Sequence, residues 1–213
     1  MIVVATHNNI KILKTFLDSL KNIDLQNEAV LIIDTNSQDI EFQKEFNIIE
    51  SVYPYTFIRL DYSCYDSGAY IWAFQNIPSN NYIFLQDSIE IINPDYISVI
   101  KNKLQEFDVV AGFDFHYSYD VNPEQKPWVE TDIEFVDYPI GGIFGPIFSA
   151  RKSILDKIPK HWLKFPTNKL LQQGMERRWS LMFHSINATK TYLEGYGDIH
   201  SSKYIKKHFY IRP

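Results

Sequence analysis

Residues 1–9 read MIVVATHNN. The apolar run from Ile2 to Ala5 stops at four polar residues, as expected for a buried strand that leaves the core at its end. Residues 29–37, AVLIIDTNS, repeat the pattern. A strand, a helix and a second strand predict a βαβ unit with a parallel sheet. The helix is indicated by apolar residues at helical spacing between the strands, namely Leu13, Phe16, Leu17 and Leu20.

The same alternation continues along the chain. It predicts one α/β domain over residues 1–213, with a mostly parallel central sheet flanked by helices. Residues 61–68 are expected to form a polar turn, and residues 116–139 a long irregular loop. Further strands are expected at 55–60, 82–85, 109–112, 141–148 and 191–193, and further helices at 41–50, 69–76, 95–106, 151–158 and 175–186.

Composition and charge narrow the class of protein. The chain has 213 residues, 45% of them hydrophobic, and a net charge of −5. This acidic balance argues against nucleic acid as a partner, because phosphate contacts need a basic face. No apolar run reaches about 18 residues, so no membrane span is expected. The single cysteine, Cys64, excludes an intrachain disulfide and favours a reducing, cytoplasmic compartment.

Polar side chains follow the ends of the predicted strands. The carboxyl ends of parallel strands meet at one edge of a sheet, where α/β proteins bind ligands. Carboxylates and amides suit the hydroxyl groups of a ribose or sugar, but several carboxylates would repel a diphosphate unless a divalent cation intervened. The edge residues are Thr6, His7, Asn8, Asp34, Asp61, Asp66 and Asp87. We therefore expect Asp87 to meet Mn²⁺ or Mg²⁺ with a phosphate on its other side.

Four segments carry a family resemblance. MIVVATHNN, LIIDTNSQD, YDSGAYIWAFQN and NYIFLQDSIEIINPD resemble the GT-A glycosyltransferases in order and spacing. Among these, the chain is most similar to the glycosyltransferase domain that chloroviruses encode for their capsid glycans, which would place it in the host cytoplasm. The resemblance implies a Rossmann-like GT-A domain that moves a sugar from a UDP-sugar to a glycan or glycoprotein acceptor. It also implies a nucleotide-binding half, residues 1–115, and an acceptor-side half, residues 116–213.

The resemblance also implies roles for individual residues on the donor side. The nucleoside would contact Thr6, His7, Asn8 and Asp34, and the ribose and donor sugar would lie along Asp66, Gly68 and Tyr70. Other interpretations stay open. Thr6 and Asn8 are also common turn formers, and Asp34 could instead close an Asx-turn.

The metal site predicted by the resemblance departs from the family pattern. Gln86-Asp87-Ser88 falls on the Asp-x-Asp metal motif, but only Asp87 is a carboxylate. The resemblance implies that His200, late in the chain, supplies a second ligand to Mn²⁺ or Mg²⁺. The basic run that holds Lys203, Lys206 and Lys207 would neutralise the diphosphate, with Lys206 as the candidate. A surface histidine and a solvated lysine face are the alternatives.

The catalytic base has two candidates. Glu176 begins a predicted helix where the family often carries an acidic residue facing the acceptor, and Asp114 ends a predicted strand. Two other functions remain open. A nucleotidyltransferase would have a similar architecture but usually a glycine-rich, basic first loop, which THNNIKILK lacks. A non-catalytic carbohydrate-binding protein would explain the missing outer acids of the metal motif.

Overall fold

The structure is a computed structural model that describes residues 1–114, 124, 128–129, 132–133, 141–193 and 202–207. Its central strands are β1 (Ile2–Thr6), β2 (Val30–Asp34), β3 (Thr56–Arg59), β4 (Asn81–Gln86), β6 (Val109–Ala111), β7 (Phe148–Arg151) and β8 (Lys190–Tyr192). Within the described chain these seven form one sheet in the order β3-β2-β1-β4-β7-β6-β8. Only β7 runs antiparallel to its neighbours there. The predicted mostly parallel α/β domain is confirmed.

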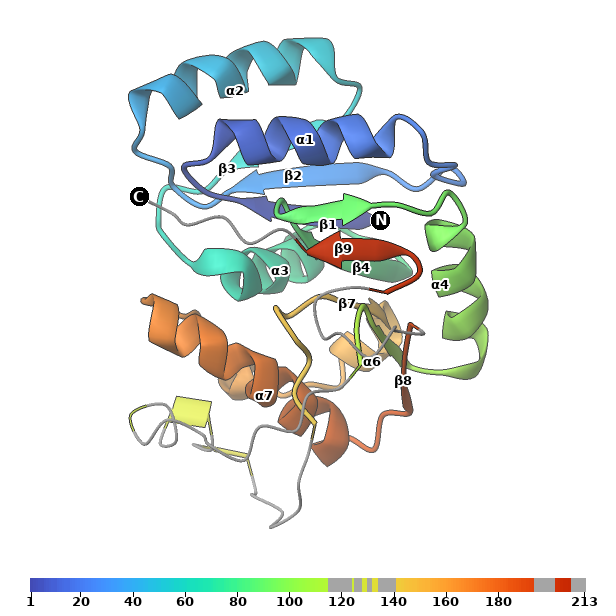
Figure 1. The fold of residues 1–213 in the computed structure, drawn as a ribbon. Coiled ribbons are helices and arrows are strands. Elements are labelled where there is room, and N and C mark those ends of the chain that lie inside the picture. The colour runs from blue at the N-terminus through green and yellow to red at the C-terminus, as the bar shows by residue number, and fades with distance from the viewer. Residues whose placement is uncertain (115–123, 125–127, 130–131, 134–140, 194–201, 208–213) are drawn as a thin grey trace.

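Helices cover both faces of the sheet (Figure 1). They are α1 (Ile10–Leu20), α2 (Ile40–Val52), α3 (Tyr65–Asn76), α4 (Tyr96–Glu106), α6 (Lys152–Leu155) and α7 (Lys169–Ser185), with a 3₁₀ turn at Lys160–Trp162. Figure 1 shows α1 and α2 on one side of the strands and α3 and α7 on the other. A separate antiparallel pair, β5 (Ile89–Ile91) with β9 (Ile205–Lys207), lies beside the main sheet.

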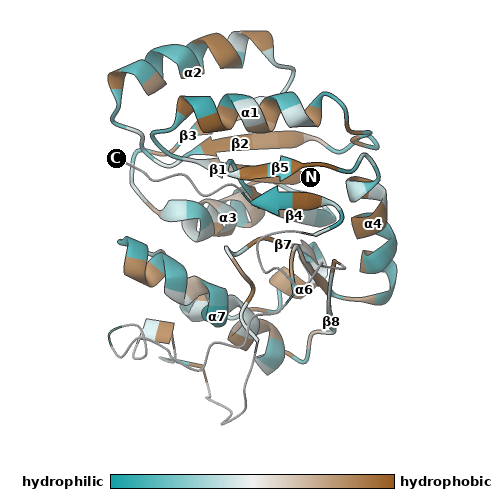
Figure 2. Ribbon diagram, in the orientation of Figure 1, coloured by the Kyte–Doolittle hydropathy of each residue, from teal (hydrophilic) through white to brown (hydrophobic). Residues whose placement is uncertain are grey.

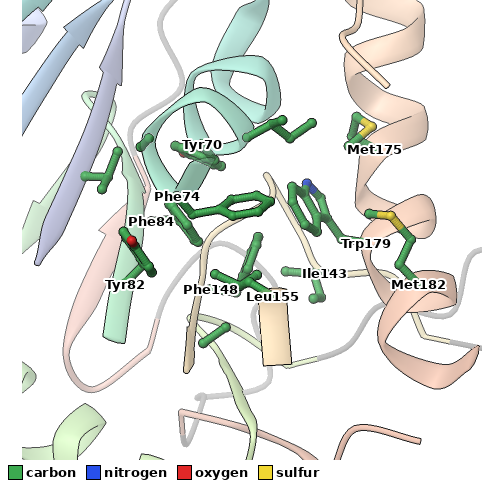
Figure 3. Close-up of a cluster of buried hydrophobic side chains, with 14 of the residues drawn as sticks. Tyr70, Phe74, Tyr82, Phe84, Ile143, Phe148, Leu155, Met175, Trp179 and Met182 are labelled. Atoms are coloured by element: carbon green, nitrogen blue, oxygen red, sulfur yellow. The ribbon is translucent and has the colours of Figure 1, made fainter. Parts of the chain in front are cut away.

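Strand alternation divides the core into two clusters. Side chains of neighbouring strand residues point to opposite faces, so Val3 and Ala5 pack with α3 and α7, whereas Ile2 and Val4 pack with α1 and α4. Figure 2 shows the resulting hydrophobic central strands and the mixed surfaces of α1 and α2. Figure 3 shows the aromatic cluster beneath the sheet, where rings from several elements meet: Tyr70, Phe84, Phe148 and Trp179.

Two predicted helix boundaries were wrong. α3 begins at Tyr65, inside the predicted turn 61–68, and carries Asp66 in its first turn, where the helix dipole favours an acid. α7 begins at Lys169, six residues before the predicted start, because the Asn168 side chain caps it by accepting from Leu171 N at 2.9 Å.

Two strands also differ from prediction. The strand expected at 141–148 lies instead at Phe148–Arg151, where β7 pairs with both β4 and β6. The basic run near the C-terminus, where no strand was predicted, contributes β9. Within the described residues, no helix is long and apolar enough to cross a membrane.

Chain order creates a topological switch point between β1 and β4. The chain moves outward from β1 through β2 to β3, and then returns to place β4 on the other side of β1. In open α/β sheets, ligands bind in the crevice outside the carboxyl ends of the strands at such a point. A ligand site is therefore expected at the ends of β1 and β4.

Candidate functional site

Thr6 and Asp87 meet at the switch point. The hydroxyl of Thr6 donates to Asp87 Oδ2 at 2.7 Å, and the backbone N–H of Asp87 donates to Ala5 O at 3.2 Å. Asp87 is only 5% exposed. A carboxylate buried this far needs polar partners, and the strand ends supply them. The structure thus brings together two residues that were predicted separately from the ends of β1 and β4.

Asn8 joins the loop after β1 to the loop after β2. Its side-chain oxygen accepts from Gln38 N at 2.9 Å and from Asp39 N at 3.1 Å, and its own N–H donates to Ser37 Oγ at 2.7 Å. Its φ of 50° lies in the left-handed region, which asparagine tolerates better than most residues. These contacts show a structural role for Asn8, the turn-former alternative, while contact with a nucleoside stays a prediction.

His7 is oriented by the same loops. Its Nδ1 donates to Thr35 O at 3.0 Å, and its Nε2 accepts from the Asn8 amide at 2.9 Å. Together these contacts select the tautomer that carries its proton on Nδ1. His7 thus lies at the predicted edge with its ring held by backbone and amide groups.

Asp34 is buried at the end of β2, with 2% of its surface exposed. Its Oδ1 accepts from Ser37 N at 3.1 Å and from Ser37 Oγ at 2.5 Å. This local turn is the Asx-type alternative that the sequence left open. It accounts for one carboxylate oxygen, and contact between Asp34 and a nucleoside stays a prediction.

Gln86 connects an acid to a base at the end of β4. Its amide group donates to Asp66 Oδ2, and its Oε1 accepts from Lys207 Nζ. Gln172 on α7 also donates to Asp66 Oδ2, at 3.3 Å. The first turn of α3, the end of β4, α7 and β9 therefore converge on one polar cluster.

Lys207, one of the three lysines predicted to neutralise the diphosphate, contacts this cluster through Gln86. Ile205 is fully buried, and strand alternation puts Lys207 on the same face of β9, whereas Lys206 is exposed on the other face. The diphosphate role assigned to Lys206 therefore passes to Lys207 as a proposal.

The surroundings of the Lys207 ammonium are mixed. Burial lowers its pKa, the negative charges of Asp66, Glu176 and Asp87 act in the opposite direction, and Lys169 adds to the lowering. Glu176 and Asp87 therefore lie within electrostatic range of Lys207.

The two candidate bases flank one segment, residues 143–147. Ile143 N donates to the backbone oxygen of Glu176 at 2.9 Å, and Gly112 N donates to Ile147 O at 2.9 Å, two residues before Asp114. Asp114 Oδ1 is buried and has no hydrogen-bond partner among the residues that the structure describes. The assignment of either carboxylate as the base stays a prediction.

Gly68 and Tyr70 belong to the packed layer beneath the site. A Cβ on Gly68 would lie 2.4 Å from the Cβ of Cys64, so the glycine is needed for close packing. The Tyr70 ring is fully buried and stacks on Phe84 at 4.8 Å. Burial, and then the charges of Asp66 and Asp87, raise the Tyr70 pKa well above its usual value. The Tyr70 side chain is packed in the core, and its predicted contact with a donor stays a prediction.

Cys64 is a buried residue rather than a nucleophile. Burial, together with the charge of Asp66, raises the pKa of its thiol to about 12. Because the thiolate is the reactive form, native Cys64 should stay unlabelled by a disulfide reagent at pH 8 and react fully once urea unfolds the chain. Following thiol release spectroscopically checks this, and rapid labelling of the native protein would contradict it.

The described residues do not fit a divalent-cation site. Mg²⁺ and Mn²⁺ prefer carboxylate and other oxygen ligands, but the motif offers the single carboxylate of Asp87, and the Gln86 oxygen already accepts from the Lys207 ammonium. Among the residues described, no group of three or more His, Cys, Asp or Glu side chains could hold a metal ion. The predicted ligand His200 lies outside the described residues.

Comparison with known proteins decides the family. Residues 1–196 match the family model described as glycosyl transferase family 2. The chain belongs to this family. Its members are glycosyltransferases that generally use a divalent metal ion. The family match favours glycosyl transfer over the nucleotidyltransferase alternative. A search of curated proteins found no match.

Solved structures similar to this family 2 glycosyltransferase include those of S. aureus TarS. Residues 1–349 of TarS in complex with UDP align with a TM-score of 0.59 and 16% identity, covering 96% of this chain and 58% of that one. The complex with UDP-GlcNAc gives 0.58 and 15%, with 96% and 56% covered. A further TarS structure gives 0.57 and 14%, with 96% and 35% covered. The chain thus spans less than two thirds of these proteins, and the likeness supports the GT-A-like fold.

Proposed function

We propose that the chain transfers a sugar from a UDP-sugar to a hydroxyl group of a glycan or glycoprotein acceptor. The observation that carries the proposal is the family match over residues 1–196, which spans β1 to β8. The TarS structures in complex with UDP and UDP-GlcNAc support uridine as the nucleoside. The further likeness to the chlorovirus domain, and a location in the host cytoplasm, stay predictions.

The donor would bind across the switch point between β1 and β4. Thr6, His7, Asn8 and Asp34 line the nucleoside side of this edge in the proposal. The diphosphate would lie toward the polar cluster of Asp66, Gln86, Asp87 and Lys207, where a positive side chain faces it. Under this arrangement residues 1–115 bind the nucleotide and residues 116–213 complete the acceptor side.

The reaction breaks the bond between the anomeric carbon and the β-phosphate oxygen of UDP, and forms one between that carbon and an acceptor oxygen. The electron pair of the broken bond leaves with UDP, and a positive group near the diphosphate stabilises that charge. In an inverting reaction a carboxylate takes the proton of the acceptor hydroxyl. We favour Glu176 as this base, because its helix α7 also contributes Gln172 to the Asp66 cluster, and we keep Asp114 as the second candidate.

UDP release from a panel of UDP-sugars tests the proposal, with mono- and oligosaccharides as acceptors. We expect UDP to raise the Tm of the protein and at least one UDP-sugar to turn over. Pyrophosphate release from a nucleoside triphosphate would favour the nucleotidyltransferase instead. UDP binding without turnover on any acceptor would favour a binding protein. If UDP leaves the Tm unchanged and no UDP-sugar reacts, the proposal is wrong.

A further inference from the structure

We propose that the Lys207 ammonium takes the place of the divalent cation at the donor diphosphate, so that this chain binds its donor without a metal ion. The inference rests on the proposed function. Family members generally use a divalent ion, whereas the described residues at the corresponding place do not fit one. A cationic side chain lies there instead.

Gln86 places a neutral amide where the family motif has a carboxylate. By resemblance it stands at the first position of the Asp-x-Asp motif, where a carboxylate would hold a metal ion. Here the position is a neutral amide whose oxygen accepts from Lys207 Nζ and whose amino group donates to Asp66. The amide is thus turned with its oxygen toward a cation, as a metal-binding carboxylate would be, but the cation belongs to the chain.

Lys207 is held in place by its own strand and by an aromatic ring, without any ligand. β9 pairs with β5, which directly follows the motif, and Ile89 is the register partner of Lys207. The ring of Phe144 lies 5.4 Å from Nζ, within range of a cation–π contact. A donor group that is fixed in advance stabilises developing charge without reorganising during the reaction.

Gly145 lies directly against the Lys207 ammonium. Its φ of 59° lies in the left-handed region, and a Cβ there would come within 2.9 Å of Lys207 Nζ and 3.3 Å of Gln86 Oε1. The glycine therefore leaves room for the ammonium beside the motif. Divalent binding is disfavoured at the same point, because a metal ion on Asp87 would be repelled by the neighbouring ammonium.

Lys207 supplies a positive charge to a cluster that is otherwise rich in acidic side chains. Asp66, Asp87 and Glu176 favour the charged form of the lysine against the effect of burial. A bound diphosphate adds negative charge next to the same ammonium, and leaves as UDP when the sugar is transferred. One lysine would then bind the donor and stabilise the leaving group.

Calorimetric titration of UDP tests the inference, with EDTA present and, separately, with excess Mn²⁺. We expect the wild-type Kd for UDP to agree within about threefold in the two buffers. Lys207→Met should weaken UDP binding by about 100-fold and should leave binding of uridine, which lacks phosphates, nearly unchanged. Lys206→Met is the matched control, because it removes the same charge from an exposed position on the opposite face of β9. The Kd of this variant for UDP should stay close to that of wild type.

The outcomes separate the inference from the proposed function. UDP binding that disappears in EDTA and returns with Mn²⁺ overturns the inference and leaves the proposed function standing. Equal effects of the two lysine variants also overturn it. A wild-type protein that binds UDP in neither buffer overturns the proposed function itself. If Lys207→Met does not fold, the comparison of wild-type UDP binding in EDTA and in Mn²⁺ still shows whether binding needs a metal ion.

Discussion

Asp87→Ala should lower the turnover of a UDP-sugar by about 100-fold while the chain stays folded. The Asp87 carboxylate accepts from Thr6 at 2.7 Å, and its charge favours the protonated form of Lys207. Truncation removes both effects at the switch point, where the donor is proposed to bind. Measuring kcat/KM together with the circular dichroism spectrum checks the prediction.

Two variants control this experiment. Asp87→Asn keeps the shape and an oxygen for Thr6 but removes the charge, so its activity should lie between those of wild type and Asp87→Ala. Asp95→Asn removes one charge from an exposed position before α4 and should leave activity within about twofold, as expected for a surface substitution. Wild-type activity in a well-folded Asp87→Ala protein would mean that the carboxylate has no part in the reaction.

Arg178→Met should lower the free energy of unfolding by about 3–5 kcal/mol, because three carbonyl groups lose their donors at a cost of about 1–3 kcal/mol each. Arg178 is fully buried on α7. Its Nε and Nη2 donate to Trp162 O at 2.9 and 2.7 Å, and its Nη1 donates to Trp128 O at 3.0 Å and Val129 O at 2.9 Å. The substitution keeps apolar bulk but withdraws every donor from these three carbonyl groups.

Urea unfolding measures this effect, with Arg177→Met as the control. Arg177 is the neighbouring residue on α7 and is partly exposed, so its loss should cost less than about 1 kcal/mol. Burial lowers the pKa of Arg178 to about 10, so the side chain remains charged at neutral pH. If the two variants unfold at the same urea concentration, Arg178 does not fasten residues 128–129 and 162 to α7.

The sheet could be predicted because its central strands correspond to continuous apolar runs in the sequence. Ile2 to Ala5 and residues 30–33 are buried on both faces, as expected for central parallel strands. The ends of β1, β2 and β4 followed from the same pattern, which is why Thr6, Asp34 and Asp87 could be placed at one edge. Strand pairing then brought Thr6 and Asp87 into contact.

The remaining parts of the site depend on contacts between distant residues. β9 has three residues, and its strand character comes from pairing with β5, more than 110 positions earlier. Sequence alone therefore could not choose Lys207 over Lys206 without knowing that Ile205 points inward. Gln172 was missed for a similar reason, because its contact with Asp66 exists only once α7 packs against α3.

The most direct measurement is a crystal structure of the protein soaked with UDP and Mn²⁺, with diffraction data collected at the manganese absorption edge. The account predicts the diphosphate of UDP at the switch point, within about 3 Å of Lys207 Nζ, and no anomalous peak between it and Asp87. A manganese peak bridging Asp87 and the phosphates, or UDP bound away from the ends of β1 and β4, would contradict it.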